Sequence, residues 1–250
     1  MEKSLSYFGI TDIGPVRENN EDAFCVKEIW NGTHILLLVV DGCGGYEGGE
    51  VASDIAVKTI LNVLESEHGD SRMDLLRMAI VNANNIIHRE RETHENLSSM
   101  GCVLTAVIID IENNLALLAH VGDTRCYLMD ESGIRKLTHD HSMVGELEDD
   151  GYLSELEAMH HPLRSVIDRM VGDETHYPDD GFVDTTIIPL PAKYGLLLCS
   201  DGLTDVVNSN EIKTILQSEY TTEEKCRSLV EMANKKSGKD NITVIIAETI

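Results

Sequence analysis

The sequence predicts an α+β fold in which antiparallel sheets are covered by helices. Strand-like runs come in meandering groups, and paired helical patterns separate one group from the next. Strands and helices do not alternate regularly along the chain, which disfavours a doubly wound parallel sheet. No Pro- or Ser-rich linker, low-complexity tract or repeat interrupts the sequence. We therefore expect one domain over residues 1–250.

The elements follow from apolar spacing along the chain. The run 34–40 is almost entirely apolar and reads as a buried strand. Apolar residues at helical spacing in 51–64 and 73–87 predict two helices, the second capped by Ser71. The polar span 142–170 reads as short helices and loop. The predicted strands are 5–13, 22–30, 34–40, 102–111, 114–121, 124–129, 133–138, 182–188, 194–199 and 242–248, and a last helix is predicted over 222–236.

Composition and charge exclude several classes of function. The chain has 44 acidic and 20 basic residues, so its formal net charge is -24. Such a surface repels nucleic acid and anionic membranes, and we expect neither as a partner. No apolar run has the length of a membrane span or of a signal peptide. The six cysteines form no C-x-x-C pair, so we expect a reducing, cytoplasmic setting.

Acidic residues follow or precede several apolar strands. A single Asp beside Gly at a strand end is more often a turn than a ligand. The pattern recurs here, and neighbouring strands of one sheet bring their ends close together. The residues concerned are Asp41, Asp123 and Asp201 after apolar runs, Asp240 before the last strand, and Glu21 and Asp22 at the start of the second strand.

Carboxylates gathered at one sheet edge repel each other unless they bind protons or a cation. Oxygen ligands favour hard ions, so Mg²⁺ or Mn²⁺ suits this set better than Zn²⁺ or copper. No cysteine–histidine set has zinc spacing. The glycines after Asp41 lack the Gly-Lys-Ser/Thr of a phosphate loop, and the acids lack EF-hand spacing. The sequence therefore predicts a magnesium or manganese site.

Six motifs in this order resemble those of the metal-dependent serine/threonine protein phosphatases, the PPM or type 2C family. Each motif alone is weak, but six at family-like separations over nearly the whole chain are specific. The length is similar to the bacterial single-domain form. The motifs are Arg17-Glu-Asn-Asn-Glu-Asp22, Asp41-Gly-Cys-Gly-Gly45 with Gly49-Glu50, His120-Val-Gly-Asp-Thr-Arg125, Leu137-Thr-His-Asp-His-Ser142, Cys199-Ser-Asp-Gly202 and Asp240-Asn241.

The resemblance implies a four-layer α-β-β-α sandwich, with two mainly antiparallel sheets flanked by helix pairs. It also implies a centre of two Mn²⁺ or Mg²⁺ ions, with a third ion in bacterial relatives. The ligands it implies are Asp41 bridging both ions, the Gly42 carbonyl on one, Asp201 and Asp240 on the other, Glu21 and Asp22 in or just behind the ligand set, and Asp123 with Asp201 on the third ion.

Two metal ions can activate a water at neutral pH and balance charge on the phosphoryl oxygens, so no protein nucleophile is required. No cysteine- or serine-based catalytic constellation is evident. Arg17 is the best candidate for binding the substrate phosphate, because its planar guanidinium can contact two phosphate oxygens. The ordinary alternative for Arg17 is a surface salt bridge with a neighbour such as Glu18.

Some residues depart from the family pattern, and the roles of others are undecided from the sequence. Cys43 stands where relatives carry Met, or His as an acid for the leaving group, so that acid is unassigned. Nearby carboxylates should keep the Cys43 thiol protonated, which favours an inert cysteine over a redox-sensitive one. His139 and His141 lie in a motif whose role is structural. His160 and His161 fall in the region of the mobile flap, where either could touch substrate or carry a proton.

The resemblance implies hydrolysis of phosphoserine and phosphothreonine in proteins. Its partners would be phosphoprotein substrates and, by analogy, a cognate serine/threonine kinase. One alternative is a pseudophosphatase that binds without turnover, which the complete set of motif acids disfavours. A second is a structural cation-binding module, which leaves Arg17 unexplained. The sequence names neither the physiological substrate nor the oligomeric state.

Overall fold

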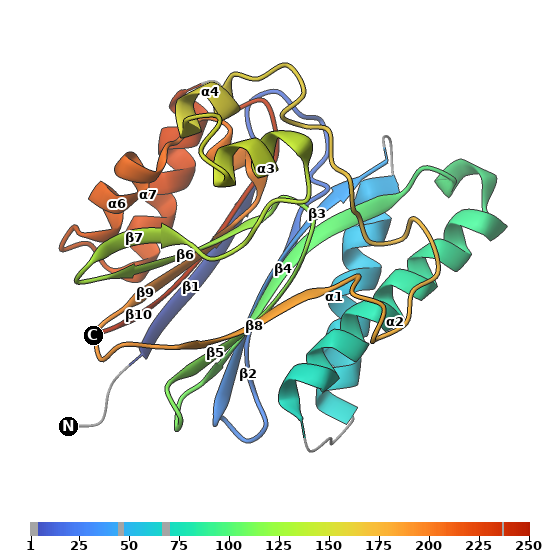
Figure 1. Ribbon diagram of the computed structural model, residues 1–250, viewed down its shortest axis with the longest axis horizontal. Helices are drawn as coiled ribbons and strands as arrows, with labels where there is room; N and C mark the ends of the chain where they lie inside the picture. Colours follow the sequence, from blue (N-terminus) through green and yellow to red (C-terminus); the bar gives the residue numbers. More distant parts are fainter. Residues whose placement is uncertain (1–4, 45–47, 67–70, 237) are drawn as a thin grey trace. The chain divides into compact units, whose positions relative to one another are not determined.

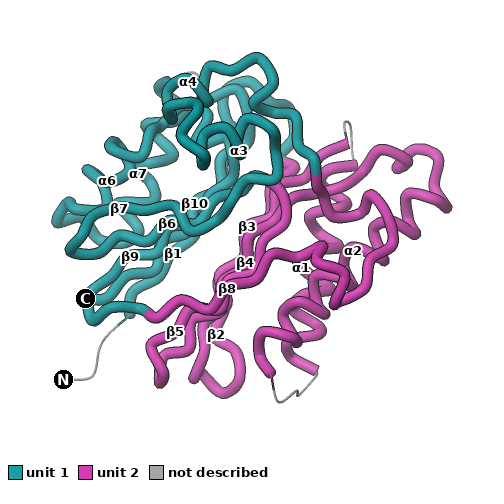
Figure 2. Tube along the Cα trace, in the orientation of Figure 1, with its two compact units in different colours: residues 1–20, 123–168, 190–250 teal, residues 21–122, 169–189 magenta. Residues whose placement is uncertain are grey.

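A computed structural model describes residues 5–44, 48–66, 71–236 and 238–250. The chain divides into two compact units (Figure 2). Unit 1 comprises Met1–Asn20, Asp123–Asp168 and Leu190–Ile250, and unit 2 comprises Glu21–Gly122 and Arg169–Pro189. Each unit contains one five-stranded antiparallel sheet with its own helices (Figure 1).

The sheet of unit 1 pairs the first strand of the chain with the last. Its order is β1-β10-β9-β6-β7, and every neighbouring pair is antiparallel. The register sets Leu5 opposite Thr249 and Val244 opposite Cys199. The strands are β1 Leu5–Asp12, β6 Arg125–Asp130, β7 Gly133–Lys136, β9 Gly195–Cys199 and β10 Ile242–Thr249.

The helices of unit 1 are short except for α7. Three of them, α4, α6 and α7, begin with a capping box. Helix α7 begins after Thr221, whose side chain and that of Glu224 form a capping box. Leu203, Leu229 and Ile246 are fully buried in one apolar cluster between these helices and the sheet. The helices are α3 Met143–Asp149, α4 Glu155–Met159, α5 Asp201–Thr204, α6 Ser209–Leu216 and α7 Thr222–Lys235.

The sheet of unit 2 has the order β2-β3-β4-β5-β8. Its two central strands, β3 and β4, are apolar along most of their length because both are almost fully buried. The register sets His34 opposite Asp110 at one end and Cys43 opposite Gly101 at the other. The strands are β2 Ala23–Ile29, β3 His34–Cys43, β4 Gly101–Asp110, β5 Leu115–Val121 and β8 Asp184–Pro189.

Two long helices, α1 Gly48–Ser66 and α2 Arg72–Thr93, cover the sheet of unit 2, and a short 3₁₀ turn, η1 Glu95–Leu97, follows them (Figure 1). The predicted cap of α2 is confirmed, since the Asp74 amide donates to Ser71 Oγ at 3.2 Å. Helix α1 packs on β3 and β4, and α2 packs on α1 and β5, with Leu38, Ile60 and Leu76 fully buried in the shared apolar cluster.

The predicted α+β class is confirmed, with two antiparallel sheets that are each flanked by helices. Strand β3 continues past Val40 to Cys43, so Asp41 and Gly42 lie within it. Helices α5 and α6 were not predicted. The Asn208 and Glu211 capping box is the sequence signal that could have found α6. Among the described residues, no helix combines the length and apolar character of a membrane span.

Candidate active site

Asp201 and Asp240 lie at the same edge of the sheet of unit 1. Strand β9 ends one residue before Ser200, and the Ser200 amide donates to the Thr243 carbonyl of β10 at 3.1 Å. Asp201 therefore begins α5 beside the residues that lead into β10. A Cβ on Gly202 would come 2.0 Å from the carbonyl oxygen of Asn241, so only glycine permits this approach.

Asn241 holds the loop that carries Arg17. Its buried side-chain amide donates to the carbonyls of Ile13 and Asn19, both at 2.9 Å. Gly14 packs against the Asp240 carbonyl with a φ of +78°, a conformation that favours glycine. The two ends of the loop are thus fixed to the segment that contains Asp240.

Arg17 contacts this same segment. Its Nη2 lies 2.7 Å from Asp240 Oδ2, and its Nε donates to the Lys239 carbonyl at 3.3 Å. The Arg17 side chain is 45% exposed and that of Asp240 is 35% exposed. The guanidinium can therefore reach a ligand from solvent while it stays beside Asp240.

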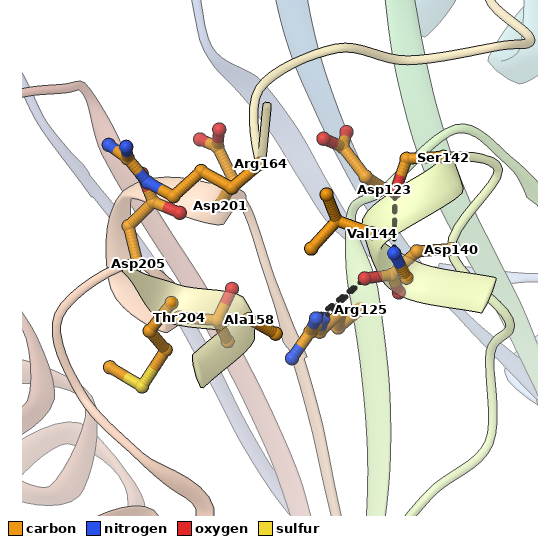
Figure 3. Close-up of a pocket in the computed structure, with 12 residues that line it drawn as sticks. Asp123, Arg125, Asp140, Ser142, Val144, Ala158, Arg164, Asp201, Thr204 and Asp205 are labelled. Carbon is orange, nitrogen blue, oxygen red and sulfur yellow. Dashed lines mark hydrogen bonds and ion pairs between the residues drawn. The ribbon is translucent and has the colours of Figure 1, made fainter. Parts of the chain in front are cut away.

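Asp123 and Asp201 line one small pocket of unit 1, together with Asp205 (Figure 3). The pocket has a volume of about 30 Å³, enough for a water or an ion of similar size. Burial, with Asp140 and Asp205 nearby, raises the pKa of Asp123 to about 7. Burial also raises the pKa of Asp205, although Arg164 Nε donates to Asp205 Oδ2 at 2.8 Å and opposes this.

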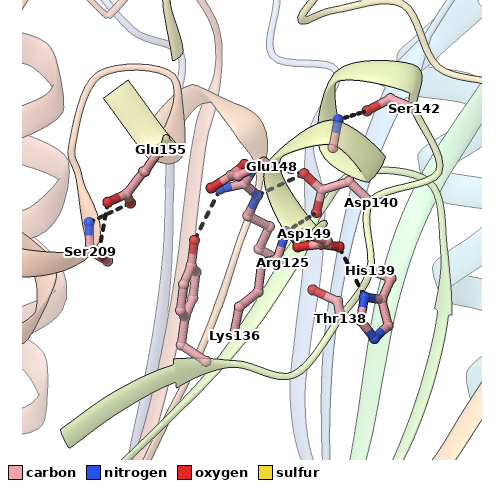
Figure 4. Close-up of polar contacts among 12 residues, drawn as sticks. Arg125, Lys136, Thr138, His139, Asp140, Ser142, Glu148, Asp149, Glu155 and Ser209 are labelled. Carbon is pink, nitrogen blue, oxygen red and sulfur yellow. Dashed lines mark hydrogen bonds and ion pairs between the residues drawn. The ribbon is translucent and has the colours of Figure 1, made fainter. Parts of the chain in front are cut away.

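An ion-pair network supports the wall of this pocket. Arg125 Nη2 lies 2.6 Å from Asp140 Oδ2 and 2.7 Å from Glu148 Oε2, which joins β6 to α3 (Figure 4). Ser142 caps α3 by accepting from the Gly145 amide at 3.0 Å. The exposed His139 contacts Asp149 at 2.9 Å. The contacts of His139, Asp140 and Ser142 accord with a structural role for this motif.

Unit 2 places Glu21, Asp22, Asp41 and Gly42 around the start of β2 and the end of β3. The Gly42 amide donates to the Glu21 carbonyl at 3.2 Å. A Cβ on Gly42 would come 2.2 Å from the Gly49 carbonyl, so the backbone of β3 touches the first turn of α1. Asp22 is 8% exposed and Asp41 is half-buried. Gly45, part of the same motif, lies outside the described residues.

The sequence left the roles of Cys43, His160 and His161 undecided, and the structure shows which atoms each of them contacts. Cys43 Sγ lies 3.8 Å from Met170 Sδ, and both atoms belong to unit 2. In unit 1, the ring of His160 contacts the Leu156 carbonyl through Nδ1 at 2.7 Å. His161 Nδ1 accepts from the Leu163 amide at 3.2 Å. Neither contact assigns a proton-transfer role to these histidines.

Sequence reasoning missed Arg164, Asp205 and the structural role of Asn241. Asn241 is part of the Asp240-Asn241 motif, and Asp205 directly follows α5, the helix that begins with Asp201. Arg164 carries no local signal, because its partner Asp205 is far away in the sequence.

The chemistry of the donor groups fits a hard divalent cation. Every implied ligand is a carboxylate or a backbone carbonyl, the oxygen donors that Mg²⁺ and Mn²⁺ prefer. Glycines at 42 and 202 bring backbone groups closer than any side chain would allow. Within the described ranges, no three acids, histidines or cysteines are arranged closely enough to hold a metal ion together. Arg17 instead contacts the implied ligand Asp240, and Arg164 contacts Asp205, which is not an implied ligand.

Comparisons with known proteins identify relatives along the whole chain. The family described as protein phosphatase 2C matches residues 16–244. The serine/threonine phosphatase stp of Listeria monocytogenes is 37% identical over 245 residues, which cover 95% of this chain and 93% of the relative. The crystal structure of serine/threonine phosphatase Stp1 from Staphylococcus aureus is 32% identical, with a TM-score of 0.88, and covers 98% of this chain and 95% of that one.

A further solved structure is the catalytic domain of the serine/threonine protein phosphatase PstP in complex with two manganese ions. It is 31% identical to this chain, with a TM-score of 0.83, and the match covers 98% of each. The similarity therefore extends over both compact units.

Proposed function

This chain belongs to the protein phosphatase 2C family and is a protein serine/threonine phosphatase, and from that premise we propose how its residues perform the hydrolysis. The substrates are phosphoproteins. The relatives are named serine/threonine phosphatases, and they give no support to a pseudophosphatase.

We propose Mn²⁺ or Mg²⁺ as the cofactor, which the two manganese ions of the PstP structure support. Asp41 would bridge two ions, with the Gly42 carbonyl on one of them and Asp201 and Asp240 on the other. Asp22 would complete this set, with Glu21 behind it. Asp123 and Asp201 would hold a third ion, and their shared pocket supports that pairing.

When bound, the ions supply an activated water near neutral pH and offset charge on the phosphoryl group. The chain itself binds and orients the phosphate. Arg17 offers two parallel N–H donors to it, while Asn241 and Gly14 fix the loop on which Arg17 stands. Because the Arg17 side chain already lies against Asp240, little of its conformational freedom is lost on binding.

The observation that carries this assignment is the Arg17–Asp240 ion pair at 2.7 Å. The pair places Arg17, the proposed phosphate-binding residue, beside Asp240, a proposed metal ligand. The test is phosphate release from a phosphothreonine peptide with Mn²⁺, with EDTA, and in Asp201→Asn. We expect release with Mn²⁺ only, and a large loss in the variant. Release that persists in EDTA would refute the metal mechanism, and no release with any metal would favour a binding module.

Arg17→Ala should raise KM for a phosphopeptide by about tenfold or more, since it removes a charge-assisted contact to the phosphate. Binding of Mn²⁺, measured by isothermal titration calorimetry, should be retained. Arg227→Ala is the matched control, because Arg227 is an exposed arginine of unit 1 that pairs with Glu223. If KM and kcat of Arg17→Ala equal those of the wild type, the assignment of Arg17 is wrong.

The setting and partners are further proposals. A cognate serine/threonine kinase would supply the phosphoproteins, because the reaction consumes its products. A cytoplasmic location would suit the six cysteines, none of which forms a disulfide with a described residue. We also propose that residues 1–250 act as one phosphatase domain.

A further inference from the structure

A larger cavity of unit 1 lies beside Asp240. Its volume is about 550 Å³, within the range of sites that bind small molecules or peptide side chains. Asp240 and Gly202 line it, so the cavity adjoins the place where Arg17 contacts Asp240. The remaining lining residues come from α4, from the segment after it, from α5 and the residues that follow it, and from the end of α7. They include Leu156, Met159, His160, Arg164, Val206 and Lys239.

The side chains that line this cavity include more cations than acids, whereas the whole chain has more acids than cations. Three cations, Arg164, Lys236 and Lys239, line it against two acids, Asp205 and Asp240. The whole sequence has 20 basic and 44 acidic residues, so cations are concentrated here. A local excess of positive charge in an acidic protein attracts anions to that spot.

The three cations are not equally available. Lys236 is held by Glu211 at 2.6 Å. Arg164 uses only Nε for Asp205, so its two terminal amino groups make no hydrogen bond with a described residue. Lys239 is exposed and forms no ion pair within the described part of the chain. Asp205 offsets part of the charge of Arg164, which leaves Lys239 as the main cation for a ligand.

Apolar side chains also line this cavity and form what we call its apolar wall: Leu156, Met159 and Val206. Leu156 is 57% exposed although it is a large apolar residue, and Met159 and Val206 lie nearby in the same cavity. Glu155 anchors α4, because its carboxylate accepts from the Ser209 amide at 2.6 Å and from Ser209 Oγ at 2.7 Å (Figure 4). The wall is therefore fixed to α6.

We propose that this cavity receives the part of the phosphoprotein next to the phosphorylated residue, and that Lys239 selects substrates with a second anionic group there. The inference rests on the proposed function. An exposed cation beside an exposed apolar wall suits a peptide with an acidic or phosphorylated residue near apolar ones. The second anion can be a phosphate or a carboxylate, and both present the same oxygen chemistry to Lys239.

The test compares three phosphothreonine peptides of equal length. One has neutral neighbours, one has glutamates at neighbouring positions, and one has a non-hydrolysable phosphonate analogue of phosphoserine there. We expect kcat/KM to be about fivefold higher for an anionic peptide than for the neutral one, as for an accessible charge pair. Preference for the phosphonate alone would identify a second phosphate, and equal preference would identify any anion.

Lys239→Glu should remove this preference, and Lys239→Gln should reduce it. Lys239→Gln should hydrolyse para-nitrophenyl phosphate at a rate within about twofold of the wild type, because the atom of Lys239 that contacts Arg17 is the backbone carbonyl, which this substitution retains. Lys235→Glu is the matched control, since Lys235 lies in α7 outside the cavity and is 71% exposed. Wild-type activity without a preference, or a preference that survives Lys239→Glu, would overturn the inference. Loss of all hydrolysis in the wild type would instead refute the proposed function.

Discussion

Asp41→Asn is expected to reduce kcat for a phosphothreonine peptide by roughly a thousandfold, which corresponds to several kcal/mol of transition-state stabilisation. The change keeps the size of the side chain and removes its charge, so the ligand that is proposed to bridge two ions loses most of its affinity. Asp41 lies within β3 and is half-buried, and the isosteric amide should leave the strand intact. Steady-state kinetics with Mn²⁺ measure the effect.

Asp110→Asn is the matched control. Asp110 ends β4 opposite His34, at the other end of the β3–β4 pair from Cys43. It contacts Asn113 and His34 and has no role in the proposed centre. We expect its kcat to stay within about twofold of the wild-type value. If Asp41→Asn retains wild-type activity, or if Asp110→Asn loses as much, the special role of Asp41 is wrong.

Gly202→Ala should destabilise the protein by about 3 kcal/mol and abolish activity. The new Cβ would stand 2.0 Å from the Asn241 carbonyl, and both atoms belong to the backbone or its first side-chain carbon, so neither can rotate away. This clash can be relieved only if α5 and the Asp240–Asn241 segment move apart. The expected fall in Tm is roughly 10 °C, and differential scanning calorimetry measures it.

Gly195→Ala is the matched control. It measures how the loss of a glycine changes the conformational entropy of the unfolded chain when the new Cβ meets no clash. Gly195 lies in β9 of the same sheet, and a Cβ there would meet its nearest neighbours at 3.8 Å, which is ordinary contact. We expect this variant to change the free energy of unfolding by less than about 1 kcal/mol. Equal effects at the two glycines would show that the close approach at Gly202 is not what requires glycine.

The sequence predicted where the strands lie because apolar runs and the acids beside them are local features, although β3 extends past its predicted end at Val40 to Cys43. Asp41, Asp123 and Asp201 all lie at or just beyond a buried apolar run, as expected. The pairing of the first strand with the last was not predicted. It depends on contacts between residues at opposite ends of the chain, such as Leu5 and Thr249.

The side-chain arrangement around the acids could not be read from the sequence. The alternative partner for Arg17 was the adjacent Glu18, whereas the structure pairs Arg17 with Asp240. Likewise, Asn241 reaches back to Ile13 and Asn19, and no local pattern encodes those hydrogen bonds. The motif positions therefore predict which residues form the site, and the folded chain shows which contacts hold Arg17 and Asn241.

Anomalous diffraction at the manganese edge, from crystals grown with MnCl₂, tests the proposed centre most directly. We expect at least two anomalous peaks, with Asp41 contacting two ions and Asp201 and Asp240 contacting one of them. The Asp41→Asn crystals should lose at least one of these peaks. Manganese bound elsewhere, or the same peaks in Asp41→Asn, would contradict the proposal that these three aspartates hold the ions.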